Sequence, residues 1–231
     1  MKKLLLILLC LPMIGFGQNV YIPDSNFKAY LVGNSAINTN GDTEIQVSEA
    51  TVFNGSIYCP NMSISDLTGI EAFTALKTLW CGENQLTSLN VSDNTDLNEL
   101  DCHNNLLTNL DLSGATALTH LSCNDNQLTI LDIRNGNNTN MGSIQSSNNL
   151  NLTCISVDDF QFSLLNWTNP FWFGFDPQHY FSNNCSATAI EEHTTNKKLI
   201  KVTDILGRKT KNQPLFYISD DGTVEKRIRI E

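Results

Sequence analysis

Residues 75–91 read ALKTLWCGENQLTSLNV, and the same frame is written twice more in the chain, starting at Asp96 and at Ala117. Each copy begins 21 residues after the last. Aligned in this way, the three segments share several columns of one residue type each, among them those headed by Leu79, Cys81, Asn84, Leu86 and Leu89. A fixed period of this length is the signature of a repeat architecture, because each unit needs its neighbours to bury its apolar face.

Alternation at the start of each unit predicts a short strand. Leu79 and Cys81 point to one side and Trp80 to the other, since successive side chains of a strand face opposite ways. Stacked strands then form a parallel sheet over a leucine core, and the asparagine column suits a turn whose backbone groups need internal partners. The frame L-x-x-L-x-C-x-x-N-x-L resembles that of leucine-rich repeats. The resemblance implies an α/β-type repeat solenoid with its parallel sheet on the concave face.

Less regular copies extend the array over residues 51–159. Ile57 and Cys59 stand in the leucine and cysteine columns at the N-terminal end. Ile144 and Ser146 continue these columns at the C-terminal end, after a two-residue insertion that we place in the asparagine-rich tract before them. Terminal units are expected to depart from the consensus because they meet a cap instead of another repeat.

The outward strand positions are the predicted functional surface. Tyr58 and Trp80 are expected to lie side by side there, next to acidic and histidine side chains. Exposed aromatic rings suit a hot spot for a protein or stacking against a sugar. The alternative is that the aromatic pair only shields the terminal edge of the sheet. The predicted contacts on this concave face are Tyr58, Trp80, Glu99, Asp101, His103 and His120.

Residues 18–50 are expected to cap the N-terminal end, with a helix over 26–32 that Asp24 or Ser25 can cap. The twelve residues 38–49 follow and resemble the calcium loop of an EF-hand, although Asn38 replaces the usual Asp and Thr43 the usual Gly. The alternative is an Asx-rich loop that only joins the cap to the repeats. The resemblance implies weak Ca²⁺ binding, in the range of about 10⁻⁴–10⁻³ M, through Asn38, Asn40, Asp42, the backbone carbonyl of Glu44, and Glu49.

The cysteines fall into two groups. Four of them, in the column from Cys59 to Cys123, lie on adjacent parallel strands and point the same way, so they are predicted to be small buried hydrophobes. A zinc site in this column would lack the paired C-x-x-C or histidine spacing of metal ligands. Cys154 and Cys185 lie outside the column, and we predict a disulfide between them, in keeping with an exported protein.

Residues 1–17 read as a signal peptide. Lys2 and Lys3 form its charged region, residues 4–14 its apolar core, and residues 15–17 a small-x-small cleavage site. Cys10 lies inside the apolar core, which argues against a lipoprotein. The apolar run is too short to span a membrane, and no other stretch is apolar enough to anchor the chain.

Aromatic residues crowd residues 160–181, and we expect residues 160–185 to fold over the open end of the last repeat; the alternative is an exposed loop with its own partner. Residues 186–196 read as a linker. Beyond them, alternating segments predict a small C-terminal β domain. Residues 197–231 are similar to the C-terminal sorting domain (type A) of the type IX secretion system of Bacteroidota, on the segments KVTDILGR, DDGTVEK and IRI. This resemblance implies the type IX machinery as a partner and passage across the outer membrane.

Charge divides the chain. Between residues 18 and 196 three basic side chains stand against nineteen acidic ones, whereas residues 197–231 hold nine basic and five acidic ones. So acidic a body argues against nucleic acid or an anionic membrane as partner.

As a whole the chain resembles the secreted leucine-rich repeat proteins of flavobacteria. We therefore expect a secreted or cell-surface module that binds an extracellular protein or glycan; the alternative is a structural envelope component without a discrete ligand. An enzyme is not expected, because His103 and Cys102 face opposite sides of a strand and no other histidine stands in a nucleophile-and-base arrangement. No glycine-rich phosphate loop occurs either.

Overall fold

The structure is a computed structural model that describes residues 18–185 and the backbone of residues 199–203, 215–219 and 224–227. The predicted signal peptide (1–17) and linker (186–196) lie outside the described residues. The chain divides into two compact units, Met1–Cys185 and Ser186–Glu231. In the part of the chain that is described, no helix has the length and apolar character needed to cross a bilayer.

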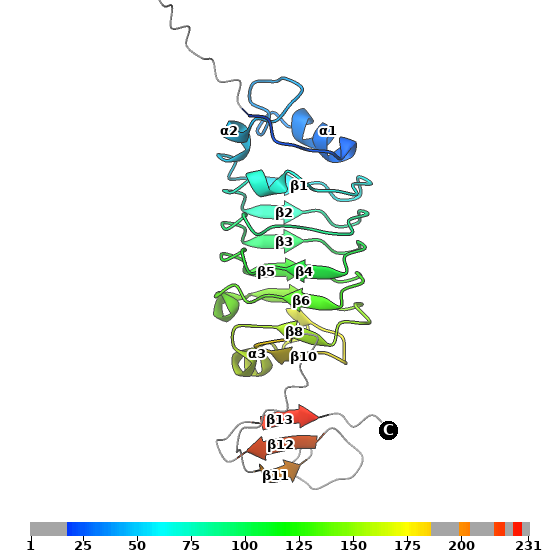
Figure 1. Cartoon of the computed structure of the whole chain (residues 1–231), viewed down its shortest axis with the longest axis vertical. Coiled ribbons are helices and arrows are strands. Elements are labelled where there is room, and N and C mark those ends of the chain that lie inside the picture. Colours follow the sequence, from blue (N-terminus) through cyan, green and yellow to red (C-terminus); the bar gives the residue numbers. More distant parts are fainter. Residues whose placement is uncertain (1–17, 186–198, 204–214, 220–223, 228–231) are drawn as a thin grey trace, which may run out of the picture. The chain divides into compact units, whose positions relative to one another are not determined.

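Parallel strands in the first unit stack at one per repeat and form a six-stranded sheet (Figure 1). Its order is β1 (Ser56–Tyr58), β2 (Thr78–Trp80), β3 (Glu99–Asp101), β5 (His120–Ser122), β7 (Ser143–Gln145) and β9 (Phe173–Gly174). Ile57, Leu79, Leu100, Leu121 and Ile144 are register partners in turn, so the predicted leucine column is confirmed. The two inserted residues before β7 are accommodated at a short 3₁₀ helix, η2 (Asn138–Asn140).

A second parallel sheet lies across the core from the first. It has the order β10 (Tyr180–Ser182), β8 (Cys154–Ser156), β6 (Ile130–Asp132) and β4 (Asn109–Asp111). Leu110 and Leu131 are register partners and are buried, so the last leucine column of the frame belongs to this sheet. The sequence did not predict the second sheet, because strands of three residues carry too little alternation to be separated from a turn.

The asparagine column forms a ladder of side-chain hydrogen bonds along the core. The Nδ2 atom of Asn105 donates to the carbonyls of Cys81 and Cys102, each at 3.1 Å, and its Oδ1 accepts from Leu86 N at 2.9 Å. Asn84, Asn126 and Asn149 make equivalent bonds in their own units. The internal partners that the sequence predicted for this turn are therefore confirmed, and each ladder carbonyl between two units is shared by consecutive asparagines.

The cysteine column is buried and free of disulfides. Cys59, Cys81, Cys102 and Cys123 are fully buried thiols. Ser146 occupies the same column in the fifth unit, where it is 1% exposed and its hydroxyl has no hydrogen-bond partner. A buried hydroxyl without a partner costs free energy that a thiol in the same place does not, because the thiol behaves as a small hydrophobe.

Replacing Ser146 by cysteine should therefore stabilise the protein. We expect Ser146→Cys to raise the free energy of unfolding by about 1–2 kcal/mol, measured by urea denaturation. The reverse change one unit earlier, Cys123→Ser, should lower it by a similar amount. Stabilisation by Cys123→Ser, or destabilisation by Ser146→Cys, would contradict this account of the column.

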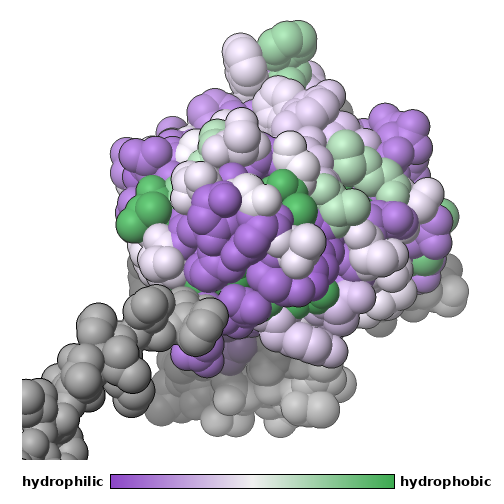
Figure 2. All heavy atoms as spheres, turned by 90° about the horizontal axis from the view of Figure 1, so that it is seen from above, coloured by the Kyte–Doolittle hydropathy of each residue, from purple (hydrophilic) through white to green (hydrophobic). Residues whose placement is uncertain are grey.

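The N-terminal cap is built around helix α1 (Ser25–Gly33). Asp24 caps it, since its Oδ1 accepts from Asn26 N at 2.9 Å and Phe27 N at 3.0 Å. Phe27 and Leu31 are fully buried against the first repeat, whose strand β1 is followed by the 3₁₀ helix η1 (Ile70–Ala72). Seen from above, the N-terminal end is mostly hydrophilic, and its hydrophobic residues lie in small separate groups (Figure 2). The cap thus closes this end of the leucine core.

The C-terminal end of the array is covered by the aromatic segment. Helix α3 (Phe160–Asn166) leads to Trp167, which is 5% exposed. Its ring stacks on Phe173 at 5.8 Å between centroids and meets Phe181 edge-on at 5.4 Å. Phe173 belongs to β9 and Phe181 to β10, so the segment adds one strand to each sheet.

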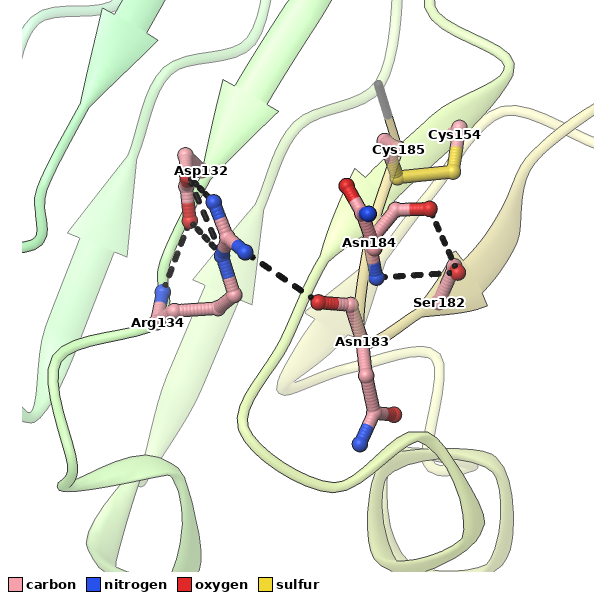
Figure 3. The surroundings of a disulfide bond; sticks show 7 residues. All are labelled: Asp132, Arg134, Cys154, Ser182, Asn183, Asn184 and Cys185. Carbon is pink, nitrogen blue, oxygen red and sulfur yellow. Dashed lines mark hydrogen bonds and ion pairs between the residues drawn. A yellow bond between two sulfur atoms is a disulfide. The ribbon is translucent and has the colours of Figure 1, made fainter. Parts of the chain in front are cut away.

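The predicted disulfide between Cys154 and Cys185 is present, with 5.8 Å between the Cα atoms (Figure 3). It joins β8 to the residue where the first unit ends. Arg134 supports the same region, because it binds Asp132 through its guanidinium and donates to the carbonyl of Asn183 at 3.2 Å. The disulfide and the Arg134 contact thus add to the strand pairing that ties the cap to the last repeats.

The second unit contains a three-stranded antiparallel sheet. Its order is β11 (Leu199–Thr203), β12 (Leu215–Ser219) and β13 (Val224–Arg227). The sheet falls within the predicted β domain, while its identity as a sorting domain stays a prediction.

Candidate functional site

The outward side chains of the six-stranded sheet, with the residues that end its strands, form one surface, which we call the six-stranded face. The register places Tyr58 beside Trp80, Trp80 beside Asp101 and Asp101 beside Ser122. A second column runs from Thr78 through Glu99 and His120 to Ser143. The side chains that the sequence assigned to one surface therefore do share it.

Tyr58 and Trp80 form an exposed aromatic pair at the N-terminal part of this face. Their ring centroids are 5.4 Å apart at an interplanar angle of 57°. Tyr58 is 55% exposed and Trp80 37% exposed. The indole Nε1 donates to Glu99 Oε1 at 2.9 Å, which fixes the orientation of the Trp80 ring. A large ring held in place while exposed loses little conformational entropy when a ligand packs on it.

The terminal edge of the sheet is closed by a different residue. Tyr58 N, on the edge strand β1, donates to the hydroxyl of Tyr30 from helix α1 at 2.8 Å. Trp80 lies on β2, one strand further in. Because the cap supplies the partner for the edge strand, the aromatic pair is not needed for that purpose, which weighs against the edge-shielding alternative.

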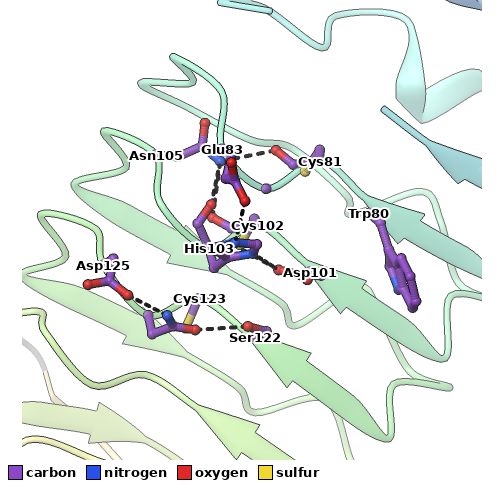
Figure 4. A network of polar contacts seen from close by, with 12 residues as sticks. Trp80, Cys81, Glu83, Asp101, Cys102, His103, Asn105, Ser122, Cys123 and Asp125 are labelled. Carbon is purple, nitrogen blue, oxygen red and sulfur yellow. Dashed lines mark hydrogen bonds and ion pairs between the residues drawn. The ribbon is translucent and has the colours of Figure 1, made fainter. Parts of the chain in front are cut away.

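Asp101 and His103 form a polar cluster on the same face, and Asp101 is the register partner of Trp80 (Figure 4). His103 Nδ1 lies 2.6 Å from Asp101 Oδ1, and His103 Nε2 lies 3.7 Å from Glu83 Oε1. The imidazole packs over Gly82, where any side chain would collide with the ring. His103 is thus held between two carboxylates of the face.

His120 stands apart from this cluster. Its Nδ1 lies 2.9 Å from the hydroxyl of Thr119, and its ring is close to the backbone of Gly142. The structure therefore joins Tyr58, Trp80 and Glu99 in one group and Asp101 and His103 in another. The contact of His120 with a ligand on this face stays a prediction.

Two residues of this face were not found by sequence reasoning. Glu83 precedes the ladder asparagine and has a φ of 56°, and the equivalent positions Asn104, Asp125 and Asn148 are left-handed as well. This recurring turn brings Glu83 over the strand end toward His103. The sequence column that precedes the asparagines could have identified Glu83 as a residue of this face. Trp172 is 50% exposed and its carbonyl accepts from Ile144 N, so it extends the His120 column beyond β7. No repeat column marks it, because it lies in the cap.

The predicted calcium loop closes on a carboxylate. Glu49 Oε1 accepts from Thr39 N, Thr39 Oγ1 and Asn40 N, and Glu49 Oε2 accepts from Gln46 N. Burial raises the pKa of Glu49, but these hydrogen bonds outweigh burial and hold the pKa below its usual value. Most lone pairs of the predicted bidentate ligand are thus occupied by protein donors.

The other predicted ligands are bonded within the loop as well. Asn38 donates to the carbonyls of Val32 and Asp42, and Asn40 donates to Asp42 Oδ2 at 2.9 Å. Helix α1 ends at Gly33, five residues before Asn38, and helix α2 (Val47–Ala50) begins inside the loop. Across the described residues, no three His, Cys, Asp or Glu side chains are grouped to hold a metal ion. The loop donors thus bond to one another in this structure, and calcium binding at residues 38–49 stays a prediction.

The buried thiols do not contribute reactive groups to the face. Burial raises the pKa of Cys102 well above its usual value, and burial also raises the pKa of Cys123 to about 12. The thiolate, which is the nucleophilic form, is therefore strongly disfavoured. Cys102 points into the core while its neighbour His103 lies on the face, as the strand alternation predicts.

Internalin J of Listeria monocytogenes serotype 4b (strain F2365) is 37% identical to the chain over 78 residues, which are 33% of this chain and 8% of internalin J. The chain therefore spans only a small part of that protein. Two solved structures are also similar. A functional domain of InlJ from Listeria monocytogenes, which includes a cysteine ladder, is 30% identical, and the match covers 61% of this chain and 38% of that one at a TM-score of 0.46.

The second solved structure is an internalin, InlF, from Listeria monocytogenes, 20% identical, with 63% of this chain and 46% of that one covered at a TM-score of 0.48. No protein-family model matches the chain. The identity to internalin J, together with the repeat frame and the stacked parallel strands, supports a leucine-rich repeat protein.

Proposed function

We propose that the chain is a non-catalytic binding module of the cell surface or the extracellular medium, and that its six-stranded face binds an extracellular protein or glycan. The observation that carries the proposal is the exposed Tyr58 and Trp80 pair, whose orientation is fixed by Glu99. Large aromatic rings held in the open are a typical anchor for protein and sugar ligands. Solenoids use a row of equivalent strand positions in the same way, as one extended surface.

The test is a binding screen with the chain from Gln18 onward, against a polysaccharide panel and extracellular proteins. For any species retained, we expect Tyr58→Ala/Trp80→Ala to weaken binding by about tenfold or more, as for the anchors of an interface. The melting temperature should stay within about 2 °C, because both rings lie at the surface. Affinity is measured by titration calorimetry and stability by circular dichroism.

A matched control removes two aromatic rings outside the face. Tyr21 is 75% exposed in the cap and Tyr180 is 55% exposed on the second sheet. Tyr21→Ala/Tyr180→Ala should leave binding unchanged. Equal loss of binding and stability in the face variant would favour edge shielding instead. If no form retains any ligand, the hypothesis of a structural envelope component is favoured instead.

We also propose weak calcium binding at residues 38–49, which rests on the spacing of the oxygen donors in the sequence. An ion that takes both oxygens of Glu49 displaces the N–H donors of Thr39, Asn40 and Gln46. The loss of these hydrogen bonds lowers the affinity for calcium. The melting temperature measured in millimolar calcium and in chelator tests this proposal. An unchanged melting temperature would contradict it.

For the route of export, we propose that residues 1–17 direct the chain across the inner membrane and residues 197–231 through the type IX system. The support is the resemblance of the segments KVTDILGR, DDGTVEK and IRI to such sorting domains. A reporter carrying a signal peptide and residues 197–231 should leave a type IX-competent cell, and its retention in the periplasm would contradict the proposal.

A further inference from the structure

The basic side chains of residues 18–185 are already paired. Residues 18–185 contain seventeen acidic side chains and three basic ones. Each basic side chain binds a carboxylate, in the pairs Lys28 with Glu44, Lys77 with Asp96, and Arg134 with Asp132. None of these cations is therefore left to receive an anionic ligand, whereas most of the carboxylates have no cationic partner.

The carboxylates lie where the aromatic rings are. Glu99 binds the edge of Trp80 through one oxygen, Asp101 is the register partner of Trp80, and Glu83 stands across His103 from Asp101. The side chain of Glu83 is 50% exposed and that of Asp101 28% exposed. Within residues 18–185, no Lys or Arg is paired with any of these three carboxylates.

Aromatic faces next to carboxylates that bind no Lys or Arg suit one class of side chain. A guanidinium or ammonium group is attracted by the face of Trp or Tyr, and the attraction grows when a carboxylate lies at its edge. The negative field of the whole unit would bring such a group in and repel an anionic glycan. A neutral sugar would use the rings but gain nothing from the charges.

We propose that the six-stranded face binds a Lys- or Arg-rich segment of an extracellular protein. This inference rests on the proposed function of the same face and names the chemistry of its partner. Tyr58 and Trp80 cover the aliphatic stems and flat cationic heads, while Glu99, Asp101 and Glu83 accept their hydrogen bonds.

The test measures binding of a peptide of alternating Arg and Gly, with its Gln-for-Arg counterpart and a neutral oligosaccharide as comparison ligands. The protein is the chain from Gln18 onward, studied by titration calorimetry at low and at physiological salt. In Glu99→Gln/Asp101→Asn the bonds to Trp80 and His103 can persist, because the Oε1 and Oδ1 acceptors remain. We expect this variant to bind the Arg peptide about tenfold more weakly.

A charge-matched control separates the face from the general acidity of the protein. Asp93 is exposed in a turn, and Asp111 is exposed on β4 of the second sheet. Asp93→Asn/Asp111→Asn removes the same charge and should change the affinity by less than about twofold, because both groups lie off the face and are screened by salt.

The outcomes distinguish the inference from the proposed function beneath it. Equal weakening in the two charge variants means unspecific attraction of a polycation and overturns the inference. If the neutral oligosaccharide binds instead and Tyr58→Ala/Trp80→Ala abolishes that binding, the inference is wrong and the proposed function stands. If the Arg peptide binds and the aromatic variant binds it equally well, the face is not the site and both are wrong.

Discussion

Asn105→Ala is expected to lower the free energy of unfolding by about 3 kcal/mol. The change leaves the buried N–H of Leu86 without its acceptor, which costs about 1–3 kcal/mol. The carbonyls of Cys81 and Cys102 each lose one of two asparagine donors, at about 0.5–1.5 kcal/mol per bond. Bulk solvent does not reach these groups freely, because Asn105 lies between two repeats at 5% exposure.

Urea denaturation of the variant measures this loss, and the melting temperature should fall by roughly 6–12 °C. Asn109→Ala is the matched control, because Asn109 is an exposed asparagine on β4 only four residues away. It should change stability by less than about 0.5 kcal/mol. A loss below about 1 kcal/mol at Asn105 would mean that the asparagine ladder is not what holds consecutive repeats together.

Removing the disulfide with Cys154→Ala/Cys185→Ala should cost about 3–4 kcal/mol, since the bond closes a loop with a sequence separation of 31. The loss should be local, because in a solenoid each unit contacts only its neighbours. We expect hydrogen exchange to accelerate at the amides of α3 and β10, while those of β2 and β3 keep their protection.

Reduction provides the control for this prediction. A reductant should lower the melting temperature of the unchanged protein and leave that of the double variant where it is. The buried column cysteines should react with an alkylating reagent only after unfolding, because their thiolates are disfavoured inside the core. Identical melting temperatures for the oxidised protein and the variant would show that the bond adds no stability.

The repeat register could be predicted because one rule is applied many times. Leu79, Leu100 and Leu121 recur at one period, and a strand that slipped by one residue would turn its leucine to solvent. The asparagine column was predictable for a related reason: a turn buried between units needs internal donors and acceptors. The Cys154–Cys185 pair followed from the geometry that kept the other cysteines apart.

The site was predictable only in part. The adjacency of Tyr58 and Trp80 follows from the register, so the sequence contained it. The hydrogen bond from Trp80 to Glu99 and the approach of Glu83 to His103 depend on rotamers and on a left-handed turn, which no period encodes. The loop around Glu49 has the donor spacing of a calcium site, and only the folded structure shows that N–H groups of the loop also bond to the carboxylate. Calcium binding there stays a prediction.

By itself, then, the sequence determined the stacking of the repeats and the side of each strand that faces the core, because burial and backbone hydrogen bonding act on every unit alike. It also determined the disulfide, because the other four cysteines of residues 18–185 share one buried column. Only the tertiary structure decided that a second sheet closes the core and that aromatic cap residues extend both sheets. It also decided that every Lys and Arg of residues 18–185 is paired with a carboxylate, while the carboxylates beside Trp80 bind no Lys or Arg. These features bring together residues that do not belong to one repeat column. The repeat pattern therefore could not predict their contacts, which form only in the folded chain.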